Sequence, residues 1–232
     1  MFFFDPVYLV FILPGLLLSL WASFRVKRAF NKFSKVPSMR GLTGAEAAAE
    51  MLRGAGIAGV GIEETHGLLS DHYNPLTKTL ALSDEVYSST SIAAIGVACH
   101  EAGHAIQHAH HYRPLWLRSA LVPTANVGSS VGYIVMLVGL MLSSTNMVLV
   151  GAVLFSAVLL FQIVTLPVEF DASTRAKQLI LDYGIISSHE REGVDRVLNA
   201  AALTYVAAAV STLLTLLYFL LRAGLLGGRR DD

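Results

Sequence analysis

The sequence predicts a mainly α-helical membrane protein with four transmembrane helices and a small antiparallel β-sheet in its polar part. Hydrophobic residues make up 54% of the 232-residue chain and charged residues only 15%, which is unlike an ordinary soluble domain. Four apolar runs are long enough, or nearly so, to cross a hydrocarbon layer of about 30 Å. These runs are Val7–Phe24, Ala120–Leu142, Met147–Leu166 and Ala201–Leu221.

The first apolar run has the features of a retained anchor rather than of a cleaved signal peptide. Asp5 and Pro6 stand where a signal peptide has its basic region, and no small-residue cleavage site closes the run. Basic residues follow the run instead of preceding it. We therefore expect residues 1–25 to form an N-terminal transmembrane anchor.

The distribution of Lys and Arg residues predicts the orientation of the chain in the membrane. The segments Arg25–Arg118 and Pro167–Asn199 hold fourteen of the seventeen basic residues and are therefore expected in the cytosol. Both termini then lie outside, although Arg222, Arg229 and Arg230 oppose that assignment. The basic residues form no face of the kind that binds nucleic acid, so no nucleic-acid partner is expected.

The first polar segment, residues 26–118, carries local signals for one short helix and two strands. The run Thr43-Gly44-Ala45-Glu46 is a capping box that opens an alanine-rich helix. Ile57–Glu63 and Lys78–Leu82 read as strands on either side of the turn signal Asn74-Pro75. We expect Lys78–Leu82 to be an edge strand, to which an extended peptide can be added.

A proline-free helix is predicted from Thr90 to Gln107, and it contains the run His100-Glu101-Ala102-Gly103-His104. Ser88, Ser89 and Thr90 are its candidate N-caps. Side chains four positions apart on a helix point the same way, so both imidazoles can bind one Zn²⁺. In zincins the glutamate of this motif accepts a proton from water that zinc has acidified. We therefore predict a zincin-like helical catalytic domain with one zinc ion per chain and Glu101 as general base.

A catalytic zinc ion usually has three protein ligands, so a third ligand is needed. His110 has the spacing of a metzincin ligand, but Gln107 stands where that geometry needs a helix-breaking glycine. On an unbroken helix both His108 and His110 lie too far along the axis. Glu169 is the better candidate, because a carboxylate beside a membrane boundary is costly unless it is paired or bound to metal.

Two residues near Glu169 are candidates for holding the ligand histidines. Ser173 lies one turn later on the same face and can hydrogen-bond the outer nitrogen of a histidine. Asp171 lies about 200° around the helix, so it either reaches a histidine or pairs with Arg175. Candidates for a contact with substrate or an oxyanion are Tyr205 and Asn74, whose simpler roles are an interfacial anchor and a turn residue.

The polar residues after the hairpin form a second cytosolic segment. Pro167 is expected to start a helix that ends near Gly184, and Ser187-Ser188-His189-Glu190 is a capping box before the last helix. The predicted layout is an anchor (1–25), a zincin domain (26–118), a transmembrane hairpin (119–166), helices with the third ligand (167–200), and a fourth transmembrane helix with a C-terminal tail (201–232).

Five stretches of sequence carry a resemblance that covers nearly the whole chain. They are Leu69–Pro75, Leu82–Tyr87, Ser91–Gln107, Leu166–Ser173 and Asn199–Ala208. Together they closely resemble the bacterial YugP-like family of neutral zinc metallopeptidases. The order of zincin helix, membrane hairpin and glutamate helix is more distantly similar to the HtpX and CAAX prenyl protease group of gluzincins. In that group an aspartate orients a zinc histidine at the position that Ser173 holds here.

The resemblance implies an integral membrane zinc peptidase, which we expect in the bacterial plasma membrane, but it does not supply a substrate. Because Glu169 lies within a few residues of the predicted bilayer, we expect the substrates to be polypeptides that emerge from the membrane or lie on it. The alternative is a catalytically silent zinc-binding scaffold or regulator of a protein assembly, which would have no need of Glu101. A transporter is disfavoured, because the apolar runs carry almost no ionisable residue. The sequence leaves open whether the chain forms an oligomer or binds an accessory partner.

Overall fold

The computed structural model describes residues 6–67 and 70–226, which form two compact units. Unit 1 comprises Leu117–Leu166 and the described parts of Met1–Ala22 and Thr204–Asp232. Unit 2 comprises Ser23–Trp116 and Pro167–Leu203. Asp5, Leu69, Arg229 and Arg230 lie outside the described residues.

Unit 1 is built from long apolar helices. They are parts of α1 (Pro6–Phe33), α7 (Thr145–Asp182) and α8 (Arg191–Arg222), together with most of α5 (Arg113–Val127), the π-helical turn η2 (Gly128–Gly132) and α6 (Tyr133–Met141). Within the described residues, four helical segments are long and apolar enough to span a membrane, with Arg113–Met141 as the second. The predicted mainly α-helical class with four spans is confirmed.

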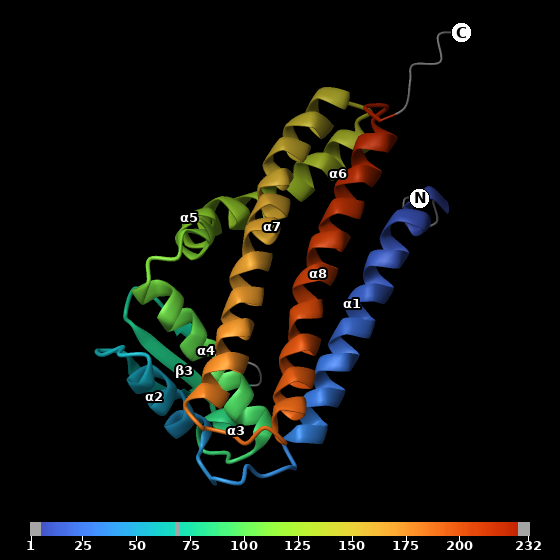
Figure 1. Cartoon of the computed structure of the whole chain (residues 1–232). Helices are drawn as coiled ribbons and strands as arrows, with labels where there is room; N and C mark the ends of the chain where they lie inside the picture. Colours follow the sequence, from blue (N-terminus) through green and yellow to red (C-terminus); the bar gives the residue numbers. More distant parts are fainter. Residues whose placement is uncertain (1–5, 68–69, 227–232) are drawn as a thin grey trace. The chain divides into compact units, whose positions relative to one another are not determined.

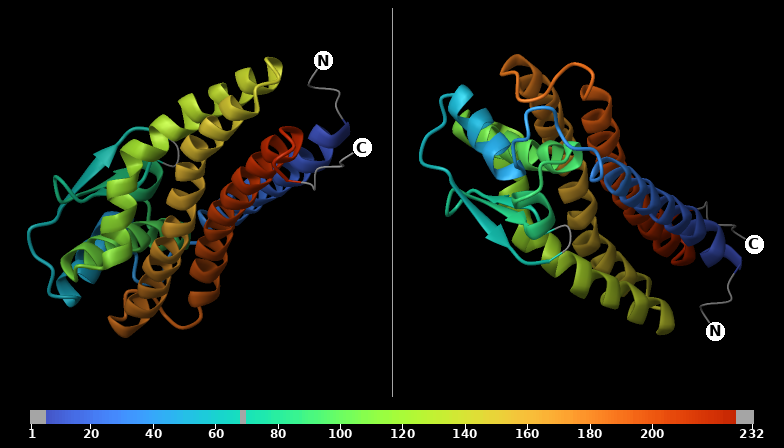
Figure 2. Two further views of the ribbon diagram at one scale, coloured as in Figure 1. Left: turned by 90° about the horizontal axis from the view of Figure 1, so that it is seen from above. Right: turned by 90° about the horizontal axis from the view of Figure 1, so that it is seen from below.

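The helices of unit 1 pack through aromatic and small residues. Helices α1 and α8 lie side by side in all three views (Figures 1 and 2), and the Ser19 and Ser211 hydroxyls are 3.2 Å apart. Helices α6 and α7 approach closely at Gly151, where a Cβ would lie 2.6 Å from the backbone nitrogen of Met136. Glycine therefore permits the tight hairpin between these two helices.

Unit 2 surrounds helix α4 (Ile92–Ala109) with α2 (Gly44–Gly54), the short helix α3 (Asp84–Tyr87), a small sheet and the polar ends of α7 and α8. The predicted capping box of α2 is present, with Glu46 Oε2 accepting from the Thr43 backbone N–H at 2.8 Å. The N-cap of α4 is Ser91, not Ser88, Ser89 or Thr90. Its hydroxyl accepts from the Ala94 N–H, three residues into the helix, as an N-cap requires.

The sheet is mixed rather than antiparallel, and this corrects two sequence expectations. Its strands are β1 (Gly61–Thr65), β2 (His72–Asn74) and β3 (Thr79–Ser83), in the order β1-β3-β2. The chain after β1 crosses to the far side of the sheet before β2, so β3 pairs in parallel with β1 and antiparallel with β2. The segment expected at an edge is therefore the central strand.

The position of β1 and the course of α7 also differ from the local signals. Strand β1 begins at Gly61 instead of Ile57, because Gly56 and Gly59 adopt positive φ and interrupt extended backbone. Pro167 lies inside α7 and does not start a new helix. Proline is tolerated inside membrane helices because neighbouring groups can satisfy the freed carbonyl. The third apolar run and the glutamate segment are thus one continuous helix.

Candidate metal centre

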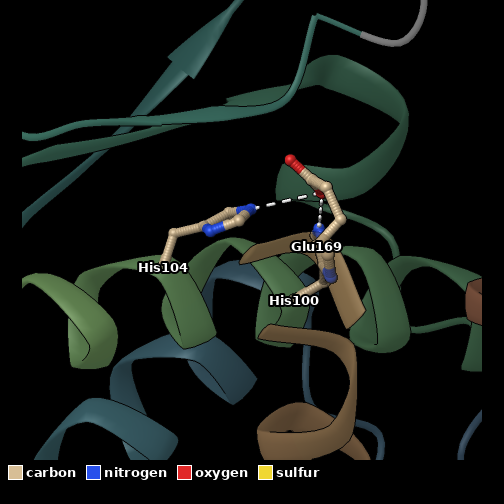
Figure 3. Close-up of side chains that lie close together, drawn as sticks. All are labelled: His100, His104 and Glu169. Atoms are coloured by element: carbon tan, nitrogen blue, oxygen red, sulfur yellow. Dashed lines mark hydrogen bonds and ion pairs between the residues drawn. The ribbon is translucent and has the colours of Figure 1, made fainter. Parts of the chain in front are cut away.

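Three side chains from two helices converge in unit 2. His100 and His104 come from successive turns of α4, and Glu169 comes from α7 (Figure 3). One potential ligand atom from each lies within 4.8 Å of the others. Glu169 Oε2 is 3.2 Å from His100 Nε2 and 3.5 Å from His104 Nε2. Glu169 is only 2% exposed, so its carboxylate is directed inward rather than into solvent.

The outer ring nitrogens of both histidines have partners of their own. The Ser173 hydroxyl lies 3.1 Å from His100 Nδ1, and Gln107 Oε1 lies 2.9 Å from His104 Nδ1. These contacts turn both Nε2 atoms toward Glu169. Two imidazoles and one carboxylate with fixed outer contacts suit a catalytic zinc ion, which takes three protein ligands and keeps a fourth position for reactants.

A glycine in the motif lets the two helices approach. A Cβ on Gly103 would lie 2.7 Å from the carbonyl oxygen of Ala172, closer than real side chains come to backbone. Gly103 lies between the two histidines on α4, and Ala172 lies between Glu169 and Ser173 on α7. The small residue therefore sets the α4–α7 separation at which Glu169 reaches both imidazoles.

Glu101 is buried beside this cluster, with 9% of its surface exposed. Burial raises its pKa, the imidazoles of His100 and His104 lower it, and the carboxylates of Glu169 and Asp71 raise it again. The net direction is upward. A carboxylate whose pKa is raised toward neutrality is a stronger proton acceptor than an ordinary surface glutamate.

The pKa of His104 is also raised, but here the neighbouring groups outweigh the effect of burial. Burial lowers its pKa, but the hydrogen bond to Glu169 and the negative charges of Glu101 and Glu169 outweigh that effect, so the pKa lies above its ordinary value. A metal ion binds neutral imidazole, so its binding must displace this proton. The cluster therefore favours positive charge at the place where a metal ion would lie.

Gln107 is a site residue that the sequence does not predict, since the sequence indicates only that it excludes a metzincin geometry. It is fully buried, and its Nε2 donates to the Val168 carbonyl at 2.8 Å and to Asp171 Oδ2 at 2.7 Å. Asp171 also accepts from Arg175 Nε at 2.6 Å, so the predicted i,i+4 ion pair is present. The available signal was a polar residue three positions after His104 on the motif helix.

The other candidate residues belong to α4, β2 and α8. His108 Nδ1 is 2.8 Å from the Tyr73 hydroxyl, and His110 is the C-cap of α4. Asn74 Oδ1 accepts from the Leu76 N–H at 2.9 Å, which is the contact of a turn residue. Tyr205 is half-buried on α8 in unit 1. Roles for Asn74 and Tyr205 in binding substrate or an oxyanion stay predictions.

Comparisons with known proteins point to the same chemistry. The model of a family described as "Putative neutral zinc metallopeptidase" matches residues 8–224. The chain is 46% identical over 215 residues to "Putative membrane protease YugP" of Bacillus subtilis (strain 168), which covers 93% of this chain and 96% of that protein. No solved structure matches the chain. The relative's name and the four apolar helices identify a membrane protein.

Proposed function

Because this chain belongs to the "Putative neutral zinc metallopeptidase" family, we propose that it is an integral membrane zinc metalloendopeptidase of the bacterial plasma membrane. The observation that carries the proposal is the convergence of His100, His104 and Glu169 beside the buried Glu101. A structural zinc site has no use for Glu101, whereas peptide hydrolysis requires a base at that place.

His100, His104 and Glu169 would hold one zinc ion per chain. When bound, zinc polarises the scissile carbonyl and acidifies water. Glu101 accepts the proton of the attacking water and then passes it to the amine that leaves. Ser173 and Gln107 keep the two imidazoles turned so that their Nε2 atoms face the metal.

Strand β2 is the better surface for an extended substrate, now that β3 is known to be central. It is an edge of the sheet, and Tyr73 of β2 contacts His108 of the motif helix. Asp71, just before β2, is close enough to Glu101 to raise the pKa of that carboxyl. A peptide paired with the outer edge of β2 would therefore lie next to Glu101.

The proposed location of the site is the cytosolic face of the membrane, with both termini outside. Support comes from the charges of unit 2, since the segments that form it carry thirteen of the seventeen Lys and Arg residues. Glu169 is three residues after Leu166, the last residue of the hairpin segment of unit 1. Polypeptides that emerge from the bilayer or lie on it are thus the proposed substrates.

The test is Glu101→Gln, which keeps the size of the side chain and removes the base. Zinc content should stay at about one per chain, while cleavage of membrane proteins in cells falls by roughly 10²–10⁴. Glu85→Gln is the matched control, because Glu85 is exposed on α3 and should leave cleavage unchanged. Full zinc occupancy with undiminished cleavage in Glu101→Gln would remove the enzymatic role and favour the scaffold.

A further inference from the structure

We infer that Gln107 is a positioning residue that fixes His104 for zinc and is itself held by α7 through Asp171. The inference rests on the proposed zinc site. It adds a residue outside the H-E-x-x-H motif that decides how tightly the metal is bound. Gln107 lies on α4 three positions after His104, and its side chain has no exposed surface.

The contacts of Gln107 leave its amide one orientation. The Val168 carbonyl at 2.8 Å and Asp171 Oδ2 at 2.7 Å are both acceptors, so the NH₂ group must face them. Oε1 is then left for His104 Nδ1, at 2.9 Å, and it can only accept. His104 must therefore carry its proton on Nδ1. In the neutral imidazole that binds a metal ion, the lone pair is then on Nε2.

Asp171 is fixed by further contacts, so it does not simply follow the amide. Its Oδ2 accepts from Arg175 Nε at 2.6 Å and its Oδ1 from a terminal guanidinium nitrogen of Arg175 at 3.3 Å. The Arg175 guanidinium in turn lies over the Tyr112 ring, 5.9 Å from its centre. Tyr112 lies just after α4, and its backbone N–H donates to the Gln107 carbonyl at 2.9 Å, so the chain of contacts returns to Gln107.

This network spans the same pair of helices that supply the ligands. Gln107 connects His104 of α4 to Val168 and Asp171 of α7. Val168 directly precedes Glu169, and Asp171 follows it by two positions. One amide therefore controls both the ring orientation of one ligand and the placement of the segment that carries another. Removing such outer contacts typically weakens metal binding by 10–100-fold.

The primary experiment measures zinc dissociation constants by chelator competition on the full-length protein in detergent. Gln107→Leu has similar size and no polar group, and we expect it to weaken zinc binding by about 10–100-fold. Gln178→Leu makes the same change at an exposed position of α7 and should leave the constant unchanged. If wild type binds no zinc, the proposed function fails. If wild type binds zinc and Gln107→Leu binds it equally well, only the positioning role fails.

A double variant keeps the inference testable if Gln107→Leu does not fold. Gln107→Glu retains the acceptor for His104 but puts a second carboxylate against Asp171, so zinc binding should weaken. Adding Asp171→Asn supplies an amide donor to that carboxylate, and we expect at least about ten-fold recovery of affinity. In the double variant the histidine ¹⁵N spectrum should again show His104 protonated at Nδ1. Equal zinc affinities of Gln107→Glu and the double variant would overturn the coupling.

Discussion

Gly103 of α4 and Ala172 of α7 meet backbone to backbone, with space for hydrogen but not for a methyl group on Gly103. The two variable positions of the H-E-x-x-H run are therefore not equivalent in this protein. The second of them determines how near Glu169 can come to the two histidines. The contact gives the motif a steric requirement in addition to its chemical one.

Gly103→Ala should separate α4 from α7 and weaken the zinc site. The added Cβ would stand 2.7 Å from a backbone oxygen, which cannot move aside as a side chain can. We expect a loss of about 1–3 kcal/mol in unfolding free energy and a clear loss of bound zinc. Thermal unfolding and metal analysis check this. The matched control is Gly96→Ala on the same helix, where the nearest atom to the added Cβ is Val194 Cγ1 at 3.3 Å. Equal effects of the two substitutions would contradict the steric argument.

Glu169→Ala should release zinc as completely as His100→Ala does. Each removes one of the three proposed ligands, whose potential ligand atoms lie within 4.8 Å of one another. His110→Ala should keep about one zinc per chain, because His110 caps α4 and lies outside the cluster. Metal analysis of the three purified proteins decides the matter. Retention of zinc in Glu169→Ala with its loss in His110→Ala would restore the metzincin-like arrangement.

Ser173→Ala should weaken zinc binding by about ten-fold without unfolding the protein, because it removes the contact that orients His100. Ser173→Asp should bind zinc at least as tightly as wild type. A carboxylate there can accept the same proton from Nδ1 of His100. Chelator competition measures both constants. An unchanged constant in Ser173→Ala would show that His100 is held by its packing alone.

Labelling of intact cells tests the proposed orientation. A cysteine introduced at Lys35 should be protected from a membrane-impermeant reagent, since it follows the first span among the basic residues. A cysteine introduced at Ser144, in the turn between α6 and α7, should react. Opening the cells should make Lys35→Cys reactive and serves as the control. Reaction of Lys35→Cys in intact cells would place the catalytic unit on the outer side.

Elements whose signals are local could be predicted from the sequence. The α2 capping box depends on Thr43 and Glu46, three residues apart, and both contacts are present. The motif helix and the four spans depend on periodicity and on apolar length within one segment. In each case the deciding residues are neighbours along the chain.

Features that depend on distant residues could not be predicted in this way. Strand β2 has only three residues, too few for an alternating pattern, and its place beside β3 is decided by pairing across the sheet. The contacts of Gln107 come from residues 61 and 64 positions later. Pro167 is expected to start a helix, but α7 continues through it.

The wide separation of the ligands along the chain has a consequence during biosynthesis. His100 and Glu169 are 69 residues apart, and the candidate span Arg113–Met141 lies between them. A nascent chain that has not yet passed Leu166 possesses both histidines and Glu101 but neither the third ligand nor Ser173. If the chain acts as proposed, hydrolytic activity can therefore arise only after the hairpin segment and residue 169 have been synthesised. A chain shorter than this would therefore lack the complete set of residues proposed to hold the metal ion.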